Sequence, residues 1–110
     1  MVVGALKMTL HLPQVGGLKP KRKVVRSIKD RVQARFKAAV AEVGSQDLWQ
    51  RIELGFAFCG DDGGHVRNQM DTVARFVENL GLAQVTDVRV EVLHLKEMAW
   101  EPCASDEWAN

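Results

Sequence analysis

Several signatures that would indicate a particular activity are absent from this sequence. Tyrosine does not occur, and the two cysteines, Cys59 and Cys103, form neither a C-x-x-C pair nor a cluster with histidine. Their spacing argues against a disulfide framework or a zinc site. The G-x-S-x-G elbow, the Walker A loop and the G-x-G-x-x-G fingerprint are also missing. We therefore expect a protein that is not an enzyme and that carries no cofactor.

Long apolar runs are lacking as well. No stretch of 18 apolar residues occurs, so the sequence predicts no membrane span. The first residues, 1–7, place no basic segment before an apolar stretch, which a secretory signal peptide would require. We therefore expect a cytoplasmic protein, and 110 residues is the length of one domain.

Charge of both signs is present but is distributed unevenly along the chain. Residues 1–55 carry eleven Lys and Arg against four Asp and Glu, whereas residues 56–110 carry four against ten. This asymmetry is typical of a surface that faces a polyanion. It is equally compatible with a dipolar surface that is only solvated, so both interpretations stay open.

Hydrophobic periodicity predicts six elements. Alternation with a period of two predicts strands over 2–12, 51–59 and 85–95. The apolar, partly β-branched segment 39–44 could extend the preceding helix, but we favour a strand because two more strands and a helix follow it at strand-like spacing. Apolar residues at three- and four-residue steps predict a helix from Pro20 to about residue 40 and another after the 60–64 loop. We expect Asp61 or Asp62 to cap the second helix and Gly81 to end it.

The order strand-helix-strand-strand-helix-strand predicts an α+β fold of the ferredoxin-like, split βαβ type. Right-handed crossovers then give a four-stranded antiparallel sheet with strand order 4-1-3-2 and both helices on one face. We expect this domain to span residues 1–95 and residues 96–110 to form a mobile, acidic tail. The open sheet face would carry mixed charge, from Lys7, Thr9, His11, Arg51, Glu53, Arg89 and Glu91.

The densest basic run lies at the predicted start of the first helix. Free backbone N–H groups and the helix dipole favour anions there, so basic side chains do not serve helix stability at this position. They could instead contact the phosphates of a nucleic acid, although a solvated charged turn is the alternative. The candidate nucleic-acid-binding residues are Lys19, Lys21, Arg22, Lys23, Arg26 and Lys29.

A second unusual stretch combines tryptophan with arginine, residues that are enriched where proteins meet partners. Asp47 could pair with Arg51, and Trp49 could pack over the sheet or stack on a base. The alternative is a hairpin loop held in place by a tryptophan anchor. The candidate partner or structural motif is Gln46, Asp47, Trp49, Gln50 and Arg51.

Two further kinds of site are not expected. His11 and His94 would fall at opposite ends of adjacent strands, and His65 has no thiol near it, so the sequence predicts no metal site. An RNA-recognition motif needs aromatic residues on the open sheet face, whereas Phe56 and Phe58 share the parity of the core.

The segments 18–28 and 40–51 resemble the bacterial YlxP-like family, a domain of unknown function. The string Gln46-Asp47-Leu48-Trp49-Gln50-Arg51 is the more specific match, and the resemblance covers about residues 1–95. It implies a ferredoxin-like fold, a genomic neighbourhood of translation and ribosome-assembly factors, and hence an RNA or ribosome partner. No enzymatic activity is established for the family. Pro20 departs from the family pattern, and the segment from Lys96 onward has no counterpart in it.

Three hypotheses follow. The first is a non-enzymatic accessory factor that binds structured RNA or the ribosome. The second is a homodimeric structural or interaction module that uses the open sheet face or an edge strand. The third is a small phosphate-handling enzyme, because acylphosphatases share this strand order, but the 13–17 loop lacks the arginine and asparagine that such chemistry needs. We identify no small-molecule substrate.

Overall fold

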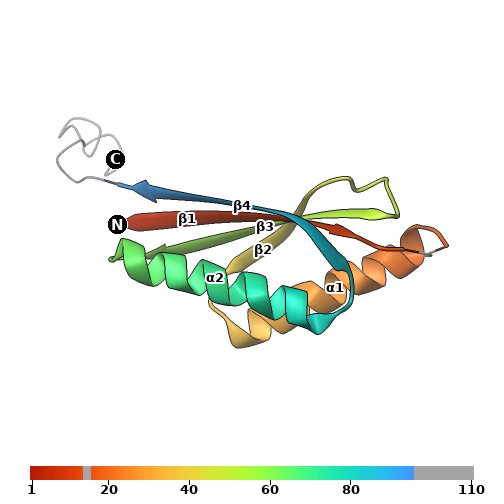
Figure 1. Ribbon diagram of the computed structural model, residues 1–110, viewed down its shortest axis with the longest axis horizontal. Helices are drawn as coiled ribbons and strands as arrows, with labels where there is room; N and C mark the ends of the chain where they lie inside the picture. The colour runs from red at the N-terminus through yellow and green to blue at the C-terminus, as the bar shows by residue number, and fades with distance from the viewer. Residues whose placement is uncertain (14–15, 96–110) are drawn as a thin grey trace, which may run out of the picture.

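The computed structural model describes residues 1–13 and 16–95 and contains the six predicted elements in the predicted order (Figure 1). A single antiparallel sheet has the order β2-β3-β1-β4, and both helices lie against one face of it. The predicted α+β, ferredoxin-like fold and its strand order are therefore confirmed. The tail predicted over 96–110 lies outside the described residues. The elements are β1 (Val2–His11), α1 (Leu18–Arg35), β2 (Ala39–Gly44), β3 (Arg51–Gly60), α2 (Gly63–Leu80) and β4 (Gln84–His94).

The first helix ends earlier than its periodicity indicates. The predicted extension to about residue 40 is wrong, because Phe36 adopts an extended backbone with φ −125° and ψ 151°. Its ring packs edge-to-face on Phe76 of α2, with the ring centroids 5.3 Å apart. This contact joins the two helices at the point where the chain turns into β2, and the strand interpretation of residues 39–44 is the correct one.

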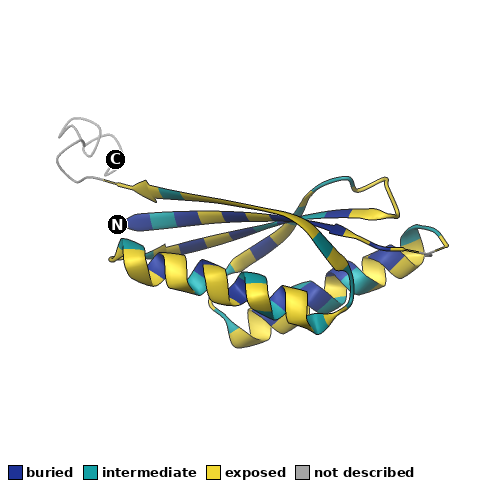
Figure 2. Cartoon of the chain, in the orientation of Figure 1, coloured by how far each residue is buried: buried dark blue, intermediate teal, exposed yellow. Residues whose placement is uncertain are grey.

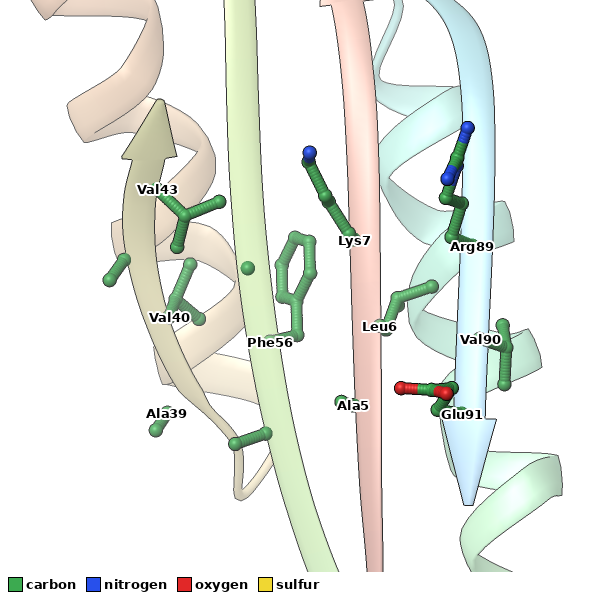
Figure 3. A pocket seen from close by; sticks show the side chains of 13 residues that line it. Ala5, Leu6, Lys7, Ala39, Val40, Val43, Phe56, Arg89, Val90 and Glu91 are labelled. Carbon is green, nitrogen blue, oxygen red and sulfur yellow. The ribbon is translucent and has the colours of Figure 1, made fainter. Parts of the chain in front are cut away.

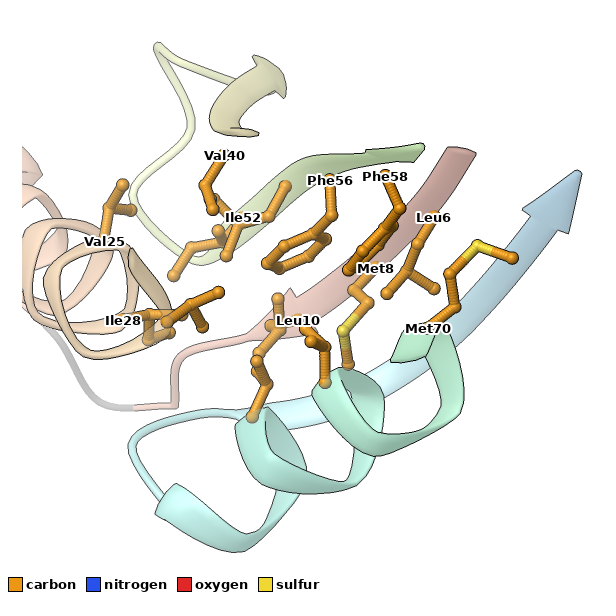
Figure 4. Close-up of a cluster of buried hydrophobic side chains, with 14 of the residues drawn as sticks. Leu6, Met8, Leu10, Val25, Ile28, Val40, Ile52, Phe56, Phe58 and Met70 are labelled. Atoms are coloured by element: carbon orange, nitrogen blue, oxygen red, sulfur yellow. The ribbon is translucent and has the colours of Figure 1, made fainter. Parts of the chain in front are cut away.

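The hydrophobic core lies between the sheet and the two helices (Figure 4). Every second side chain of β1 and of β3 points into the core. The register places these side chains beside each other, so that Leu6 pairs with Phe56 and Met8 with Leu54. Burying a side chain of this size contributes roughly 1.5–3 kcal/mol. The helices add one buried stripe each, from Val25, Ile28 and Val32 in α1 and from Val66, Met70, Val73 and Val77 in α2.

The caps of α2 are those that its sequence predicts. The Asp62 side chain accepts a hydrogen bond from the backbone N–H of His65 at 3.1 Å, and Gly81 ends the helix in the left-handed region with φ 67°. Both caps satisfy backbone groups that a helix leaves without a partner.

Both helices cover the same side of the sheet, and no other helix or strand of residues 1–13 and 16–95 covers the opposite side (Figure 1). The edge strand β4 is exposed along its length, and none of its residues is fully buried (Figure 2). Among the described residues, neither helix is long and apolar enough to cross a membrane. Among the described residues, the outer side of α1 and the open sheet face are both accessible.

Candidate functional site

The outer side of α1 carries a stripe of cations. Lys19, Arg22, Lys23 and Arg26 are exposed and Lys29 is half-buried, and their spacing of three to four residues puts them along one side of the helix. Within residues 1–13 and 16–95, none of these five side chains forms an ion pair with a carboxylate. In the described part of the chain, the stripe therefore carries positive charge that no carboxylate pairs.

The start of α1 adds to this positive potential. Gly17 occupies the N-cap position with φ 109°, no side chain caps the helix, and its first turn contains no acidic residue. The first backbone N–H groups of a helix carry partial positive charge and need acceptors. The two helices thus differ, since the N-terminus of α2 is capped by Asp62 and that of α1 receives no side-chain cap from the described residues.

Lys21 does not belong to this stripe, and its assignment as a phosphate contact is corrected. Its side chain is only 1% exposed, and its Nζ lies 2.9 Å from Oε2 of Glu42 on β2. The ammonium also donates a hydrogen bond to the carbonyl oxygen of Ser45. Oε2 of Glu42 has no hydrogen-bond partner among the described residues, so its attraction to Lys21 is chiefly coulombic. A buried and paired ammonium cannot reach a phosphate.

The sequence contains a signal for this buried pair. Lys21 lies one helical turn before Val25, so it continues the stripe that Val25, Ile28 and Val32 bury. Glu42 shares the parity of Val40, the core residue of β2. A cation and an anion that both fall on core positions predict a buried pair, because either one alone would be strongly disfavoured there.

A polar network holds the start of the β2–β3 loop. Ser45, in the left-handed region with φ 56°, donates a hydrogen bond from its hydroxyl to the Glu53 carboxylate. Lys7 lies 2.9 Å from the same carboxylate, and Arg51 lies 3.7 Å from it. The Ser45 hydroxyl first, and then Lys7 and Arg51, hold the pKa of Glu53 below its ordinary value of 4.5.

This lowered pKa predicts a contribution to acid sensitivity. A carboxyl group whose folded pKa lies below its unfolded value stabilises the fold above the unfolded pKa, and the stabilisation is lost as the pH falls through the folded value. In Glu53→Gln we expect the free energy of unfolding to fall less steeply below pH 4.5 than in the wild type. Urea titrations between pH 3 and 7 measure this, and parallel pH profiles for the two proteins would contradict the assignment.

The loop from Gln46 to Gln50 is exposed throughout, and Trp49 keeps 37% of its surface accessible. Trp49 is thus partly covered by its neighbours and partly accessible. The expected Asp47–Arg51 pair is also absent from the described residues, because Arg51 contacts Glu53 instead. Gln46 donates a long hydrogen bond to the Glu42 carbonyl, at 3.5 Å. The loop leaves an aromatic side chain free at the end of the sheet where α1 begins.

The histidines lie as the topology predicts. His11 pairs with Gln84 and His94 with Val2, so the two lie at opposite ends of the β1–β4 pair. In the part of the chain that the structure describes, no three His, Cys, Asp or Glu side chains gather in a way that could hold a metal ion.

The open sheet face carries the expected charged residues, among them Lys7, Glu53 and Arg89, but its centre is apolar. Alanine and glycine occupy its centre, and a hollow of about 930 Å³ lies over them (Figure 3). Charged residues border the hollow only on the β1 and β4 side. The sequence analysis missed this apolar centre because alanine and glycine, at the strand positions that alternate with the core residues, give only a weak hydrophobic signal. The outward-facing residues around the hollow are Ala5, Lys7, Ala39, Ala41, Val43, Gly55, Ala57, Arg89 and Glu91.

Comparison of the sequence with known families gives one match over most of the chain. Residues 3–90 match the family model described as "Protein of unknown function (DUF503)". An uncharacterised protein of Bacillus subtilis (strain 168), YlxP, is 29% identical over 90 residues, which are 82% of this chain and 98% of that protein. The resemblance noted from residues 18–28 and 40–51 is thus confirmed.

Solved structures of similar shape have low sequence identity. A dimeric protein of unknown function with a ferredoxin-like fold, from Bacteroides fragilis, has a TM-score of 0.48 and 13% identity, covering 86% of this chain and 96% of its own. A Deinococcus radiodurans protein, provisionally described as an antibiotic biosynthesis monooxygenase, has a TM-score of 0.46 and 19% identity, covering 88% and 94%. At these scores neither protein informs on function.

Proposed function

Since the chain belongs to the DUF503 family of unknown function, we propose its role from its surface: a non-enzymatic cytoplasmic accessory factor that binds structured RNA, on the ribosome or in a precursor of it. The observation that carries the proposal is the stripe of five cations on α1 without a carboxylate partner in residues 1–13 and 16–95. Lys19, Arg22, Lys23, Arg26 and Lys29 would contact phosphates. Such contacts orient a protein on RNA without reading its sequence.

The magnitude of the electrostatic effect makes this proposal testable. Each phosphate that a cation neutralises releases counterions, so log K falls with log salt by about 0.7–0.9 per contact. Five contacts then predict that affinity falls by about 100- to 500-fold between 50 and 200 mM salt. A surface that binds RNA through a single chance contact would lose only about threefold in affinity over the same salt range.

Trp49 supports a second kind of contact. The Lys21 bond to the Ser45 carbonyl holds the first residue of the β2–β3 loop against the first turn of α1. Trp49, four residues further along this loop, is exposed. Aromatic side chains beside cations stack on unpaired bases and contribute about 1–3 kcal/mol per base. An RNA with an unpaired loop next to a helical stem would engage both features.

The experiment is a salt series with ribosomal subunits and with a stem-loop RNA, followed by co-sedimentation and fluorescence anisotropy. We expect the steep loss of affinity calculated above for the wild type. Trp49→Ala should weaken binding to the stem-loop by about 5- to 100-fold without changing the salt slope, because stacking releases no counterions. A decrease of less than a few fold between 50 and 200 mM salt would overturn the proposal.

The open sheet face favours a second candidate function, that of a protein-interaction module. Water normally meets a polar sheet face, whereas this face has an apolar centre formed by Ala5, Ala57 and Gly55. The long edge strand β4 adds exposed apolar residues, among them Leu93 at 67% exposure. Such a module would bind a protein partner through the face or through the edge.

A further inference from the structure

Around its hollow, the open sheet face is divided into an apolar and a charged part. On the β2 and β3 side the hollow is lined by small apolar residues, including Ala39, Ala57 and Gly55. On the β1 and β4 side it is lined by Lys7, Arg89 and Glu91 (Figure 3). We propose that a second copy of this chain covers this face with its own open face. The inference rests on the interaction module proposed above, and it identifies both the surface and the partner.

The strand register arranges the face in rows that run across the sheet. Ala39 pairs with Ala57, Ala57 with Ala5, and Ala5 with Glu91. A second row crosses the same four strands two residues further along each of them. Its members are Ala41, Gly55, Lys7 and Arg89. In Figure 3, Lys7 and Arg89 accordingly lie at one level of the sheet, and Ala5 and Glu91 lie at the next.

These rows are complementary to each other across one particular two-fold axis. An axis that lies between two facing sheets and runs across their strands exchanges the rows and keeps each strand opposite its own copy. Ala57 then lies over Gly55 of the second copy, and Glu91 lies over Arg89. An axis along the strands would instead place β2 over β4, so that apolar residues would cover charged ones.

Charge complementarity between the two central rows favours a second copy over an unrelated partner. Glu91 forms no ion pair within the described residues, and Arg89 pairs only with Asp87, at 3.1 Å. In the two-fold arrangement each Glu91 faces Arg89 of the other copy, while Lys7 beside it keeps its pair with Glu53 of its own copy. The same pairing forms twice, as an isologous interface requires. Small residues at the centre let the two backbones approach closely.

The size of the face is also compatible with a stable dimer. Four strands about 4.8 Å apart, with about ten residues that rise about 3.4 Å each, give a flat footprint of about 600 Å². Side-chain relief makes the accessible area larger than this footprint, and stable interfaces bury about 800 Å² per partner. The arrangement leaves α1 on the outside of both copies, so a dimer would carry two separate cationic stripes.

The experiment is sedimentation velocity with light scattering on the full chain, over a concentration series from 1 to about 500 µM, with the dissociation constant as the readout. Ala57→Arg places a bulky cation at the centre of the face, and we expect it to raise the dissociation constant by more than about 100-fold. Glu91→Arg places a like charge opposite Arg89 of the other copy and should raise the dissociation constant by about 10- to 100-fold.

A charge exchange separates interface effects from folding effects. The double variant Glu91→Arg with Arg89→Glu recreates the opposite charges across the axis and should restore the dissociation constant to within about fivefold of the wild type. Glu78→Arg, an exposed charge reversal on α2, serves as the control and should leave it unchanged. Near-ultraviolet circular dichroism of each variant verifies the fold.

The outcomes distinguish this inference from the proposed module. A dimer that persists in Ala57→Arg and in Glu91→Arg overturns the face assignment and leaves an edge-mediated module standing. A wild-type chain that stays monomeric over the whole series overturns the second copy as the partner, while a heterologous partner for the face remains testable by the same variants. Restoration by the charge exchange would support the axis across the strands.

Discussion

Replacing Lys21 by alanine is expected to lower the free energy of unfolding by about 3–5 kcal/mol. The substitution leaves the Glu42 carboxylate in the interface between α1 and β2 without its counter-charge, and it removes the bond to the Ser45 carbonyl. An uncompensated charge in such a position costs far more than a surface ion pair contributes. Urea denaturation at pH 7, followed by tryptophan fluorescence and far-ultraviolet circular dichroism, measures the change.

The double variant Lys21→Met with Glu42→Leu is the matched test of this explanation. It keeps the volume of both side chains and removes both charges, so we expect a stability within about 1–2 kcal/mol of the wild type. If Lys21→Ala and Glu42→Ala each cost less than about 1 kcal/mol, the pair is effectively solvated and the buried ion pair assigned here is incorrect.

The same double variant separates structure from RNA binding. Lys21 is excluded from the cationic stripe by its burial, so a folded Lys21→Met, Glu42→Leu protein should bind stem-loop RNA with an unchanged salt slope. A slope that decreased by about one unit would return Lys21 to the set of phosphate contacts.

The second large effect concerns the cationic stripe itself. The triple variant Arg22→Gln, Lys23→Gln and Arg26→Gln should reduce the salt slope of RNA binding by about 3 units. It should also lower the affinity at 50 mM salt by about 100-fold or more. All three side chains are exposed and lack ion-pair partners in residues 1–13 and 16–95, so we expect a change in stability within about 0.5 kcal/mol per site.

The control for this variant lies on the other helix. Arg67 and Arg75 are exposed cations of α2, and Arg75 is paired with Asp71. Arg67→Gln with Arg75→Gln removes a comparable amount of positive charge from a different part of the same layer. If both variants lose affinity to the same extent, net charge rather than the α1 stripe governs binding, and the proposed interface is wrong.

Sequence reasoning located the stripe but could not decide which of its members are free. Lys19, Arg22 and Lys21 belong to one basic run and have the same chemistry. Only the rotation of α1 on the sheet, and the presence of Glu42 on the adjoining strand, separates Lys21 from the others. Local periodicity places Lys21 and Glu42 on core positions, but the pairing of these two residues, 21 apart in the chain, depends on how α1 packs on β2.

The helix end shows the same limit. The apolar stripe of α1 continues in register through Phe36, so periodicity alone predicts a longer helix. Packing on Phe76 of α2 satisfies Phe36 equally well from an extended backbone. A contact between two helices thereby fixes the point at which β2 begins.

By itself, the amino-acid sequence determined the elements, their order, the strand topology and the concentration of positive charge on the first helix. Periodicity, turn residues and the handedness of crossovers act over short distances along the chain, which is why these features can be read from it. The tertiary structure decided which carboxylate pairs with Lys21, that Trp49 keeps 37% of its surface exposed and that the open face has an apolar centre. Each of these depends on which distant residues share a neighbourhood, and only the packed sheet and helices determine that.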